Sequence, residues 1–292
     1  MQTKQQIQQL LAEAGALPNR RLGQHFLIDL NLMRLLVETA QIESSDVVLE
    51  VGCGTGSLTE ALAQQAGKVI AVELDRILCT IAQTQLAKTE NVEIINTDIL
   101  EKKRTLSSPV TEAIELARKE YSGRLLLVAN LPYNVASPVI LNLVTGPTVA
   151  DAMCVTVQRQ VAERMTAVTG SSEYGKLSIL LTATGDVKTI RVLKPTVFWP
   201  QPQVDSAMIT FARQNEKVAR IKNIQLFSQT VNLFMGHRRK MLKACARLAH
   251  ARLGNVDNWP AIFEQCSIDP TQRPQQLSPE DYIDMDSASH AG

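Results

Sequence analysis

The sequence lacks the long apolar segments on which membrane and exported proteins depend. Its apolar runs, such as the one around residues 125–128, fall far short of the roughly 18 residues that cross a bilayer. The first eleven residues are rich in glutamine and contain no apolar signal core. We therefore expect a cytoplasmic protein that has no membrane partner.

Cysteine is also scarce, and the five cysteines form no close pairs. They are Cys53, Cys79, Cys154, Cys245 and Cys266. An odd, dispersed set argues against a disulfide framework and against a zinc site, and it suits the reduced thiols of a cytosol. The histidines His25 and His237 lack the spacing of metal ligands, so we assign no metal.

Net charge is nearly absent, because 30 Lys and Arg residues face 29 Asp and Glu residues and leave +1. A nucleic-acid binder usually has a basic excess, so the total taken alone argues against one. The distribution of charge argues the other way. Residues 217–252 contain nine basic side chains and no acidic one, whereas residues 253–292 contain seven acidic side chains and a single basic one, Arg273. The near-neutral total is a cancellation of local excesses.

The chain has 292 residues, of which 45% are hydrophobic and 20% charged. This composition is globular and excludes disordered, collagen-like and fibrous proteins. The length fits one large domain or two domains.

Short apolar segments alternate with helical patterns through the first two thirds of the chain. Strands are predicted at 47–51, 69–73, 92–95, 125–129 and 152–157, and helices at 5–14, 30–40, 58–65, 77–88, 111–120 and 138–144. Such alternation is typical of an α/β fold with a mostly parallel sheet covered on both faces. Two further strands at 187–193 and 207–211, joined by a proline-rich stretch, predict an antiparallel edge.

The pattern changes after Arg213, where helical periodicity replaces strands. Helices are predicted at 224–235, 239–253 and 259–265. We therefore divide the chain into an α/β domain, residues 1–213, and a small all-α domain, residues 214–292.

A glycine-rich turn follows the first strand of the alternation. Glycine lets a backbone turn sharply and approach a ligand closely. A dinucleotide fingerprint requires glycine at position 57, where this chain has Ser57. The spacing of Gly52, Gly54 and Gly56 resembles instead motif I of S-adenosylmethionine-dependent methyltransferases, which predicts a class I, Rossmann-like fold. The alternative is a tight strand–helix turn that binds no ligand.

Carboxylates follow the next two strands. Glu73 ends the second strand, at the sheet edge where ligands of open α/β sheets bind, and can accept hydrogen bonds from both hydroxyls of a ribose. The neighbouring Asp75 is expected to cap the following helix. In methyltransferases of the class that the glycine-rich motif resembles, an acid after the third strand accepts from the adenine amino group, and Asp98 has that position, although a lone Asp in a loop is also a common turn former.

The most specific motif is Asn130-Leu131-Pro132-Tyr133, which follows the fourth strand. It resembles the (Asn/Asp/Ser)-Pro-Pro-(Tyr/Phe) motif of amino methyltransferases. An exocyclic adenine amine is a poor nucleophile, because its lone pair is delocalised into the ring. The Asn130 oxygen and the Leu131 or Pro132 carbonyl can accept its two N–H groups and free the lone pair for attack on a methyl sulfonium. An ordinary proline turn is the alternative.

Aromatic side chains are expected to hold the target base. Tyr133 offers a stacking face for a base that has left its stack. Phe198 can stack on the other face of the base or can be a core aromatic, and the sequence leaves both open. Trp199 is a weaker candidate for the same role.

A basic cluster, Arg238, Arg239, Lys240 and Lys243, is predicted at the start of a helix in the second domain. Such side chains supply phosphate contacts that weaken with salt. A solvated helix face is the alternative, but the absence of acidic residues from 217–252 favours RNA.

Several segments occur in the order found in the ribosomal RNA adenine dimethyltransferase family, which the chain resembles from about residue 20 to 282. They are 21–27 (RLGQHFL), 50–56, 130–134, 174–178 (YGKLS), 198–206, 238–240 and 272–278 (QRPQQLS). The resemblance is strongest to the bacterial small-subunit branch of the family. It implies transfer of two methyl groups from S-adenosyl-L-methionine to each of two adjacent adenosines near the 3′ end of 16S rRNA, within an immature small subunit and in ribosome biogenesis.

The resemblance also implies site residues. Cofactor contacts fall on His25, Leu27, Gly52, Glu73, Asp98 and Asn130, with Gly54 in the same loop, and base contacts fall on Asn130, Leu131, Pro132 and Tyr133. The sequence departs from the family pattern at His25, often Asn, at Cys53, often Pro, and at Met241, often Thr. A monomer is expected.

Three other functions stay open at this stage. The first is a 23S rRNA methyltransferase of the same fold that confers antibiotic resistance. The second is a ribosome-assembly factor that binds RNA without needing catalysis, against which the intact motif at 130–133 argues. The third is a dehydrogenase, which Ser57 disfavours.

Overall fold

The computed structural model describes residues 1–292 except 20–21, 102–104, 253–257 and 290–292. The chain divides into two compact units, each described by itself. Unit 1 contains residues 1–143, 147–162 and 188–212, and unit 2 contains 144–146, 163–187 and 213–292. Within the described residues, no helix is long and apolar enough to cross a membrane.

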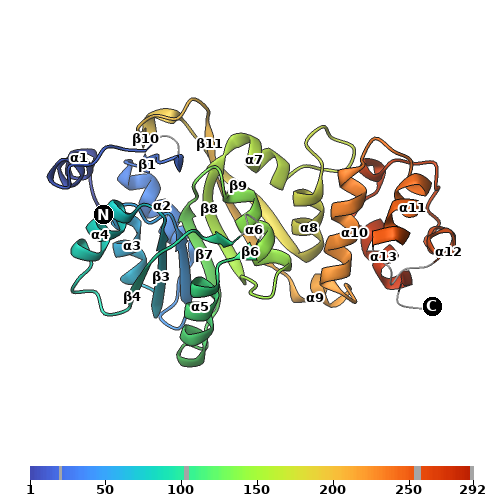
Figure 1. Cartoon of the computed structure of the whole chain (residues 1–292), viewed down its shortest axis with the longest axis horizontal. Coiled ribbons are helices and arrows are strands. Elements are labelled where there is room, and N and C mark those ends of the chain that lie inside the picture. The colour runs from blue at the N-terminus through green and yellow to red at the C-terminus, as the bar shows by residue number, and fades with distance from the viewer. Residues whose placement is uncertain (20–21, 102–104, 253–257, 290–292) are drawn as a thin grey trace. The chain divides into compact units, whose positions relative to one another are not determined.

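Unit 1 is built on a seven-stranded sheet with the order β4-β3-β2-β7-β8-β11-β9 (Figure 1). The strands are β2 (Val47–Val51), β3 (Lys68–Glu73), β4 (Val92–Asn96), β7 (Leu125–Asn130), β8 (Ala152–Gln158), β9 (Gly185–Leu193) and β11 (Ser206–Arg213). The pairs from β4 to β8 are parallel, and β11 runs antiparallel to β8. The predicted α/β class, with a mostly parallel sheet and an antiparallel edge, is confirmed.

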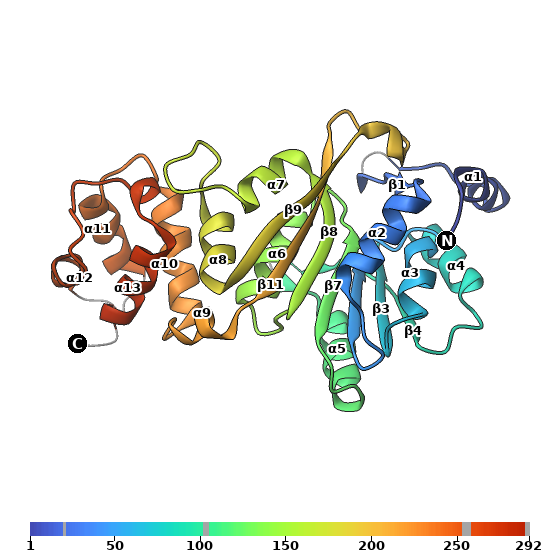
Figure 2. The same ribbon diagram turned by 180° about the vertical axis from the view of Figure 1, so that it is seen from behind.

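Helices cover both faces of this sheet. They are α2 (Leu30–Ala40), α3 (Ser57–Ala63), α4 (Arg76–Gln85), α5 (Ser108–Glu120) and α6 (Ala136–Thr145). Apolar side chains of α2 and α3 share one core cluster with alternate residues of the central strands. In Figure 1, α5 and α6 lie in front of the sheet, and in Figure 2, which shows the reverse, they lie behind it. The central strands β2 and β7 are almost wholly buried, which explains their continuous apolar sequences.

Aspartate side chains cap two of these helices, and the cap predicted at Asp75 is confirmed. Asp29 accepts hydrogen bonds from the backbone N–H groups at the start of α2, and Asp75 accepts them from Ile77 and Leu78 at the start of α4. Helix α5 begins at Ser108, three residues before its predicted start at 111, with Pro109 in its first turn, a position that proline favours.

Short elements complete the first unit. The N-terminal helix α1 (Lys4–Glu13) packs its apolar face against α4. Two-residue strands form the pairs β1 (Phe26–Leu27) with β10 (Phe198–Trp199) and β5 (Leu100–Glu101) with β6 (Thr105–Leu106). A short 3-10 helix (Pro195–Val197) precedes β10, and α7 (Arg159–Met165) follows β8. These elements were not predicted, apart from α1.

Unit 2 is helical. It contains α8 (Lys176–Thr184), α9 (Asn215–Ala219), α10 (Ile224–Gly236), α11 (Leu242–Arg252), α12 (Trp259–Gln265), a 3-10 turn (Pro274–Gln276) and α13 (Pro279–Ser289). Helix α10 contacts α8, α11 and α13, and its Phe234 ring lies 5.1 Å from the Trp259 ring and 6.4 Å from the Tyr282 ring. The buried Tyr174 hydroxyl donates to the Leu277 carbonyl at 2.8 Å.

The division of the chain differs from the predicted one at residues 163–187. These residues precede the boundary near 213, yet they belong with the C-terminal helices, because the apolar α8 packs on α10 and α13. Most residues of α8 are buried, so its apolar residues do not alternate with polar ones at helical spacing. For this reason the sequence did not indicate which elements α8 packs against.

Candidate active site

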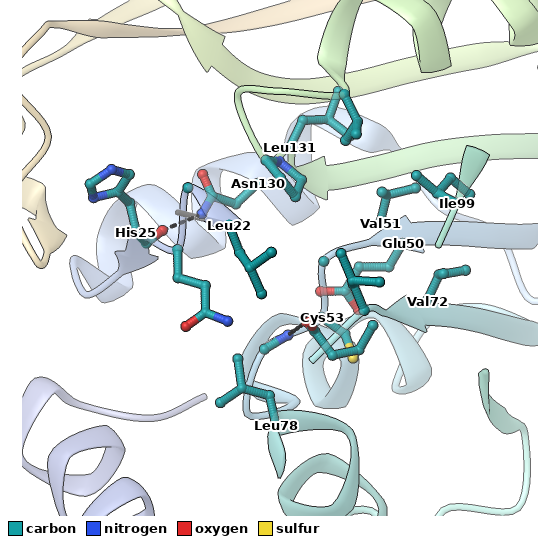
Figure 3. A pocket seen from close by; sticks show the side chains of 18 of the residues that line it. Leu22, His25, Glu50, Val51, Cys53, Val72, Leu78, Ile99, Asn130 and Leu131 are labelled. Atoms are coloured by element: carbon teal, nitrogen blue, oxygen red, sulfur yellow. Dashed lines mark hydrogen bonds between the residues drawn. The ribbon is translucent and has the colours of Figure 1, made fainter. Parts of the chain in front are cut away.

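The carboxyl ends of β2, β3 and β7 meet at one edge of the sheet and line a cavity of about 450 Å³ in unit 1. Its walls are mostly apolar, with acidic and amide groups at intervals (Figure 3). Ligands of open α/β sheets bind at this edge, because helix N-termini and loops converge there. The structure places these predicted site residues on the cavity wall: His25, Leu27, Gly52, Gly54, Glu73, Asp98, Asn130, Leu131, Pro132 and Tyr133.

The glycine-rich loop after β2 forms the floor of this cavity. Gly52 and Gly54 have φ angles of +79° and +59°, a region that other residues rarely adopt. A Cβ atom on Gly52 would lie 2.7 Å from Cγ of Pro132, and a Cβ atom on Gly54 would lie 3.0 Å from Cε1 of Phe26. Both positions therefore require glycine for two reasons. The backbone turns there with a positive φ angle, and a neighbouring side chain occupies the space that a Cβ atom would need.

Glu73 joins this loop to β3. Its Oε2 accepts from the Gly54 N–H at 2.9 Å, and its Oε1 accepts from the Asp75 N–H at 2.8 Å. The residue is 6% exposed, and this burial raises the pKa of the Glu73 carboxyl, although the two N–H donors favour its charged form. Each oxygen keeps lone pairs for further donors, so the side chain can accept from the two hydroxyls of a ribose.

Glu50 lies beneath the same loop and was not singled out from the sequence. It is buried, and its Oε2 has no hydrogen-bond partner among the described residues. Burial raises the pKa of Glu50 to about 8, and the nearby charge of Glu73 adds to the shift. At neutral pH its carboxyl is therefore mostly protonated.

Asp98 lines the cavity after β4, and its Oδ1 accepts from the Leu100 N–H at 3.0 Å. It thus forms the local turn that was the alternative for this residue, and it still presents a carboxylate to the cavity.

The amide of Asn130 is held at both ends. Its Oδ1 accepts from the hydroxyl of Thr156, and its Nδ2 donates to the backbone carbonyl of His25 at 2.8 Å (Figure 3). The parallel register sets Asn130 opposite Thr156, on β8, which brings the hydroxyl within reach. The side-chain amide therefore has one fixed orientation, with one lone pair of Oδ1 left for a ligand.

The other residues of the motif continue this wall. The Leu131 N–H donates to the Thr156 carbonyl at 3.1 Å, and the Pro132 carbonyl accepts from the Val135 N–H at 3.1 Å. The Tyr133 hydroxyl lies 2.7 Å from Oγ of Ser206, on β11. Burial raises the pKa of the Tyr133 hydroxyl, so the ring is neutral at physiological pH.

His25 reaches the motif through its backbone as well as its ring. The imidazole Nδ1 lies 2.6 Å from the Pro200 carbonyl, and the ring centroid lies 5.4 Å from that of Tyr133. Its predicted cofactor contact therefore stays a prediction, whereas its carbonyl has a definite partner in Asn130.

The stacking role considered for Phe198 is corrected by the structure. The side chain is 1% exposed and belongs to the core cluster beneath β1, where Phe198 pairs with Leu27 across the strands. A base has no access to a ring packed in this way. Instead Phe26, the strand neighbour of Leu27, lines the cavity, and its ring stacks on Trp199 at a centroid distance of 6.1 Å.

The basic cluster lies in unit 2, and its position is also corrected. Arg238, Arg239 and Lys240 form an exposed turn between α10 and α11, because the helix begins at Leu242, three residues later than predicted. Lys243 is exposed in the first turn of α11. The predicted last helical residue, Leu253, lies outside the described residues.

Part of the acidic tail contacts the basic segment elsewhere. Glu280 forms an ion pair with Arg220, and Asp286 Oδ2 accepts from the Lys222 N–H at 2.7 Å, before the start of α10. The turn at 238–240 takes part in no ion pair found within the described part of the chain. The acidic residues of the tail therefore balance the charge of the whole chain but do not neutralise this turn, which stays positively charged.

Several site residues could not be found by sequence reasoning. Thr156 and Ser206 hold the motif at 130–133 from strands that are distant in sequence, so only the register reveals them. Gln2, just before α1, contacts the glycine-rich loop, and Ile7 of α1 lines the cavity, but this N-terminal segment carries no motif. Phe26 lies in the segment 21–27 that carried the family resemblance, so that segment was a usable signal.

The buried Glu50 predicts a pH dependence of stability. A carboxyl whose folded pKa is about 8 stabilises the fold fully below its ordinary pKa of 4.5 and loses that contribution as the pH rises to 8. The free energy of unfolding should therefore fall with pH, by at most about 1.4 kcal/mol per pH unit from this group. In Glu50→Gln that decline should be smaller, as measured by urea unfolding without cofactor between about pH 5 and pH 8.

Glu38→Gln, at an exposed position of α2, is the matched control and should keep the wild-type slope. Equal slopes for the wild type and Glu50→Gln would show that Glu50 is ionised throughout this range.

A family model described as ribosomal RNA adenine dimethylase matches residues 16–285. Among curated proteins, the chain is similar to ribosomal RNA small subunit methyltransferase A of Latilactobacillus sakei, with 33% identity over 96% of this chain and 93% of the relative. The protein of the same name from Pelotomaculum thermopropionicum is 35% identical over 98% and 96% of the two chains.

Solved structures show the same fold. A dimethyladenosine transferase from Plasmodium falciparum superposes with a TM-score of 0.67 at 22% identity, over 87% of this chain and 94% of that chain. The 23S rRNA methyltransferase ErmE superposes with a TM-score of 0.60 at 20% identity, over 90% and 98%. These two likenesses support the fold alone.

Proposed function

The chain belongs to the ribosomal RNA adenine dimethylase family, and from this premise we propose that it dimethylates N6 of two adjacent adenosines near the 3′ end of 16S rRNA. As a member it is an S-adenosylmethionine-dependent methyltransferase. The substrate we propose is the immature small ribosomal subunit, and the protein acts as a cytoplasmic monomer in ribosome biogenesis. The fixed amide of Asn130 on the cavity wall is the observation that carries this proposal.

The cavity fits S-adenosylmethionine. Glu73 presents a buried carboxylate to the ribose position, and Asp98 presents one to the adenine position. A side chain on Gly52 would collide with Pro132, so the loop keeps its path along the cavity wall only with glycine at this position. His25, Leu27, Gly54 and Asn130 complete the proposed cofactor contacts. When bound, the cofactor supplies an electrophilic methyl group on a sulfonium.

The residues of the motif activate the adenine amine. The remaining lone pair of Asn130 Oδ1 accepts one amine N–H. The Leu131 or the Pro132 carbonyl is the second acceptor that we propose, since the Pro132 oxygen keeps a lone pair beside its bond from Val135. Both bonds draw the nitrogen toward a tetrahedral geometry, which frees its lone pair. Tyr133 provides the stacking face, and its bond to Ser206 fixes the ring.

Methyl transfer to small subunits tests the proposal directly. Small subunits that lack the modification are incubated with the protein and labelled cofactor, and the digested rRNA fragment is measured by mass spectrometry. Two methyl groups on each of two adjacent adenosines are expected, and Asn130→Ala should lower the rate at least about a hundredfold.

Unmethylated adenosines, with cofactor binding demonstrated, would contradict the proposal. A parallel reaction with naked 23S rRNA identifies the alternative substrate. If Asn130→Ala supports subunit maturation in cells, RNA binding has a role in assembly that is separable from catalysis.

The exposed turn at 238–240, with Lys243, is the proposed RNA contact of unit 2. Replacing Arg238, Arg239 and Lys240 with Ala should reduce the slope of log affinity against log salt by about 2 to 3, since each phosphate contact contributes about 0.7–0.9. Filter binding of rRNA fragments across a salt series measures the slope.

A variant with three other exposed cations replaced, Lys88, Arg118 and Lys119 of unit 1, removes the same charge and is the control. If both variants lose equal slope, the turn acts only through net charge.

A further inference from the structure

The N-terminal helix α1 forms part of the cavity wall, although the family model begins only at residue 16. Ile7 is buried and lines the cavity. Together with Leu11 it packs against Leu78 and Ile81 of α4, and Leu78 lines the cavity as well. The helix therefore closes a side of the pocket that the motif residues leave open.

Gln2, just before this helix, is bonded to the end of the glycine-rich loop. Its Nε2 donates to the Thr55 carbonyl at 3.1 Å, and its Oε1 accepts from the Thr55 hydroxyl at 2.6 Å. Its backbone N–H donates to Oγ of Ser57 at 2.6 Å. All three residues are buried, with Gln2 at 9% exposure. A long polar side chain is rarely buried unless such partners satisfy it.

These bonds flank Gly56, the N-cap residue before α3, which has a left-handed φ of +83° and provides no side-chain cap. On the other side of the loop, Gly54 donates to Glu73. The loop is thus held from two directions, by Glu73 on β3 and by Gln2 at the N-terminus. Ser57, which excluded a dinucleotide fingerprint, has a role here as the acceptor for the Gln2 backbone.

We propose that Gln2 is a positioning residue of the cofactor pocket. Helix α1 forms one wall of this pocket, and its packing against α4 is coupled to cofactor binding. The inference rests on the proposed function in so far as the cofactor is S-adenosylmethionine. Loss of the Gln2 side-chain bonds leaves the Thr55 carbonyl and hydroxyl unpaired in a buried place, which loosens the loop. A ligand that binds only the ordered loop then spends part of its binding free energy on ordering it, so its observed affinity falls.

Isothermal titration with S-adenosylhomocysteine tests this without any RNA. Gln2→Leu replaces the amide with a shorter apolar group, and its Kd should rise about fivefold to twentyfold. Gln8→Leu, at an exposed position of α1, is the matched control and should bind like the wild type.

A double-mutant cycle separates this contact from a general loss of stability. Thr55→Val removes the hydroxyl with little change of shape, and the pair Gln2→Leu with Thr55→Val should be no weaker than the worse single variant. In methyl transfer, KM for the cofactor should rise in Gln2→Leu while kcat and KM for the RNA stay unchanged.

Amide hydrogen exchange measures the coupling itself. Bound S-adenosylhomocysteine should slow exchange across α1 in the wild type, and less so in Gln2→Leu. Either of two results would overturn the inference: a Kd for Gln2→Leu within twofold of that of the control, or an amide exchange rate in α1 that is the same with and without the ligand. If the wild type fails to bind S-adenosylhomocysteine, the proposed function itself falls. Binding without methyl transfer to rRNA would contradict the proposed substrate and leave this inference standing.

Discussion

Two hydrogen bonds on the Asn130 amide join three segments that are distant in sequence. The Thr156 hydroxyl, on β8, and the His25 carbonyl, beside β1, fix which end of the amide faces which neighbour. An amide that rotated by 180° would set Nδ2 against the hydroxyl of Thr156 and Oδ1 against a carbonyl, which cannot donate. The chemistry proposed for this protein needs an acceptor in one place, and this network provides it before any substrate binds.

The other pocket residues lie at the same carboxyl edge of the sheet, and some of them lower the stability of the fold. Glu50 and Glu73 are both buried under the glycine-rich loop, and burial raises the pKa of each. Pro132 fills the space that a side chain on Gly52 would need, so the loop after β2 and the motif after β7 fit together only with glycine there. Such buried acids and close approaches are typical of functional sites, where local stability is given up for binding.

The sequence predicted what depends on local pattern and missed what depends on register. The strands β2, β3, β4, β7 and β8 were predicted to within one residue at each end, because buried parallel strands have continuous apolar sequences and β4, which is only partly buried, still has the apolar pairs that mark a strand. The partners Thr156 and Ser206 could not be inferred, because they meet the motif across the sheet. Phe198 and Phe26 could not be assigned for the same reason. Strand pairing decides whether such an aromatic side chain faces the core or the cavity, and the pairing of β1 with β10 places Phe198 in the core.

The orientation of the Asn130 amide is the central claim, and Thr156→Val tests it most directly. Valine keeps the shape of threonine and removes the hydroxyl that holds Oδ1. With saturating cofactor, the single-turnover rate of methyl transfer should fall roughly tenfold to a hundredfold while the affinity for S-adenosylhomocysteine stays within about twofold. Thr210→Val, on the adjacent strand β11, should change neither. A Thr156→Val rate equal to that of the wild type would contradict the account.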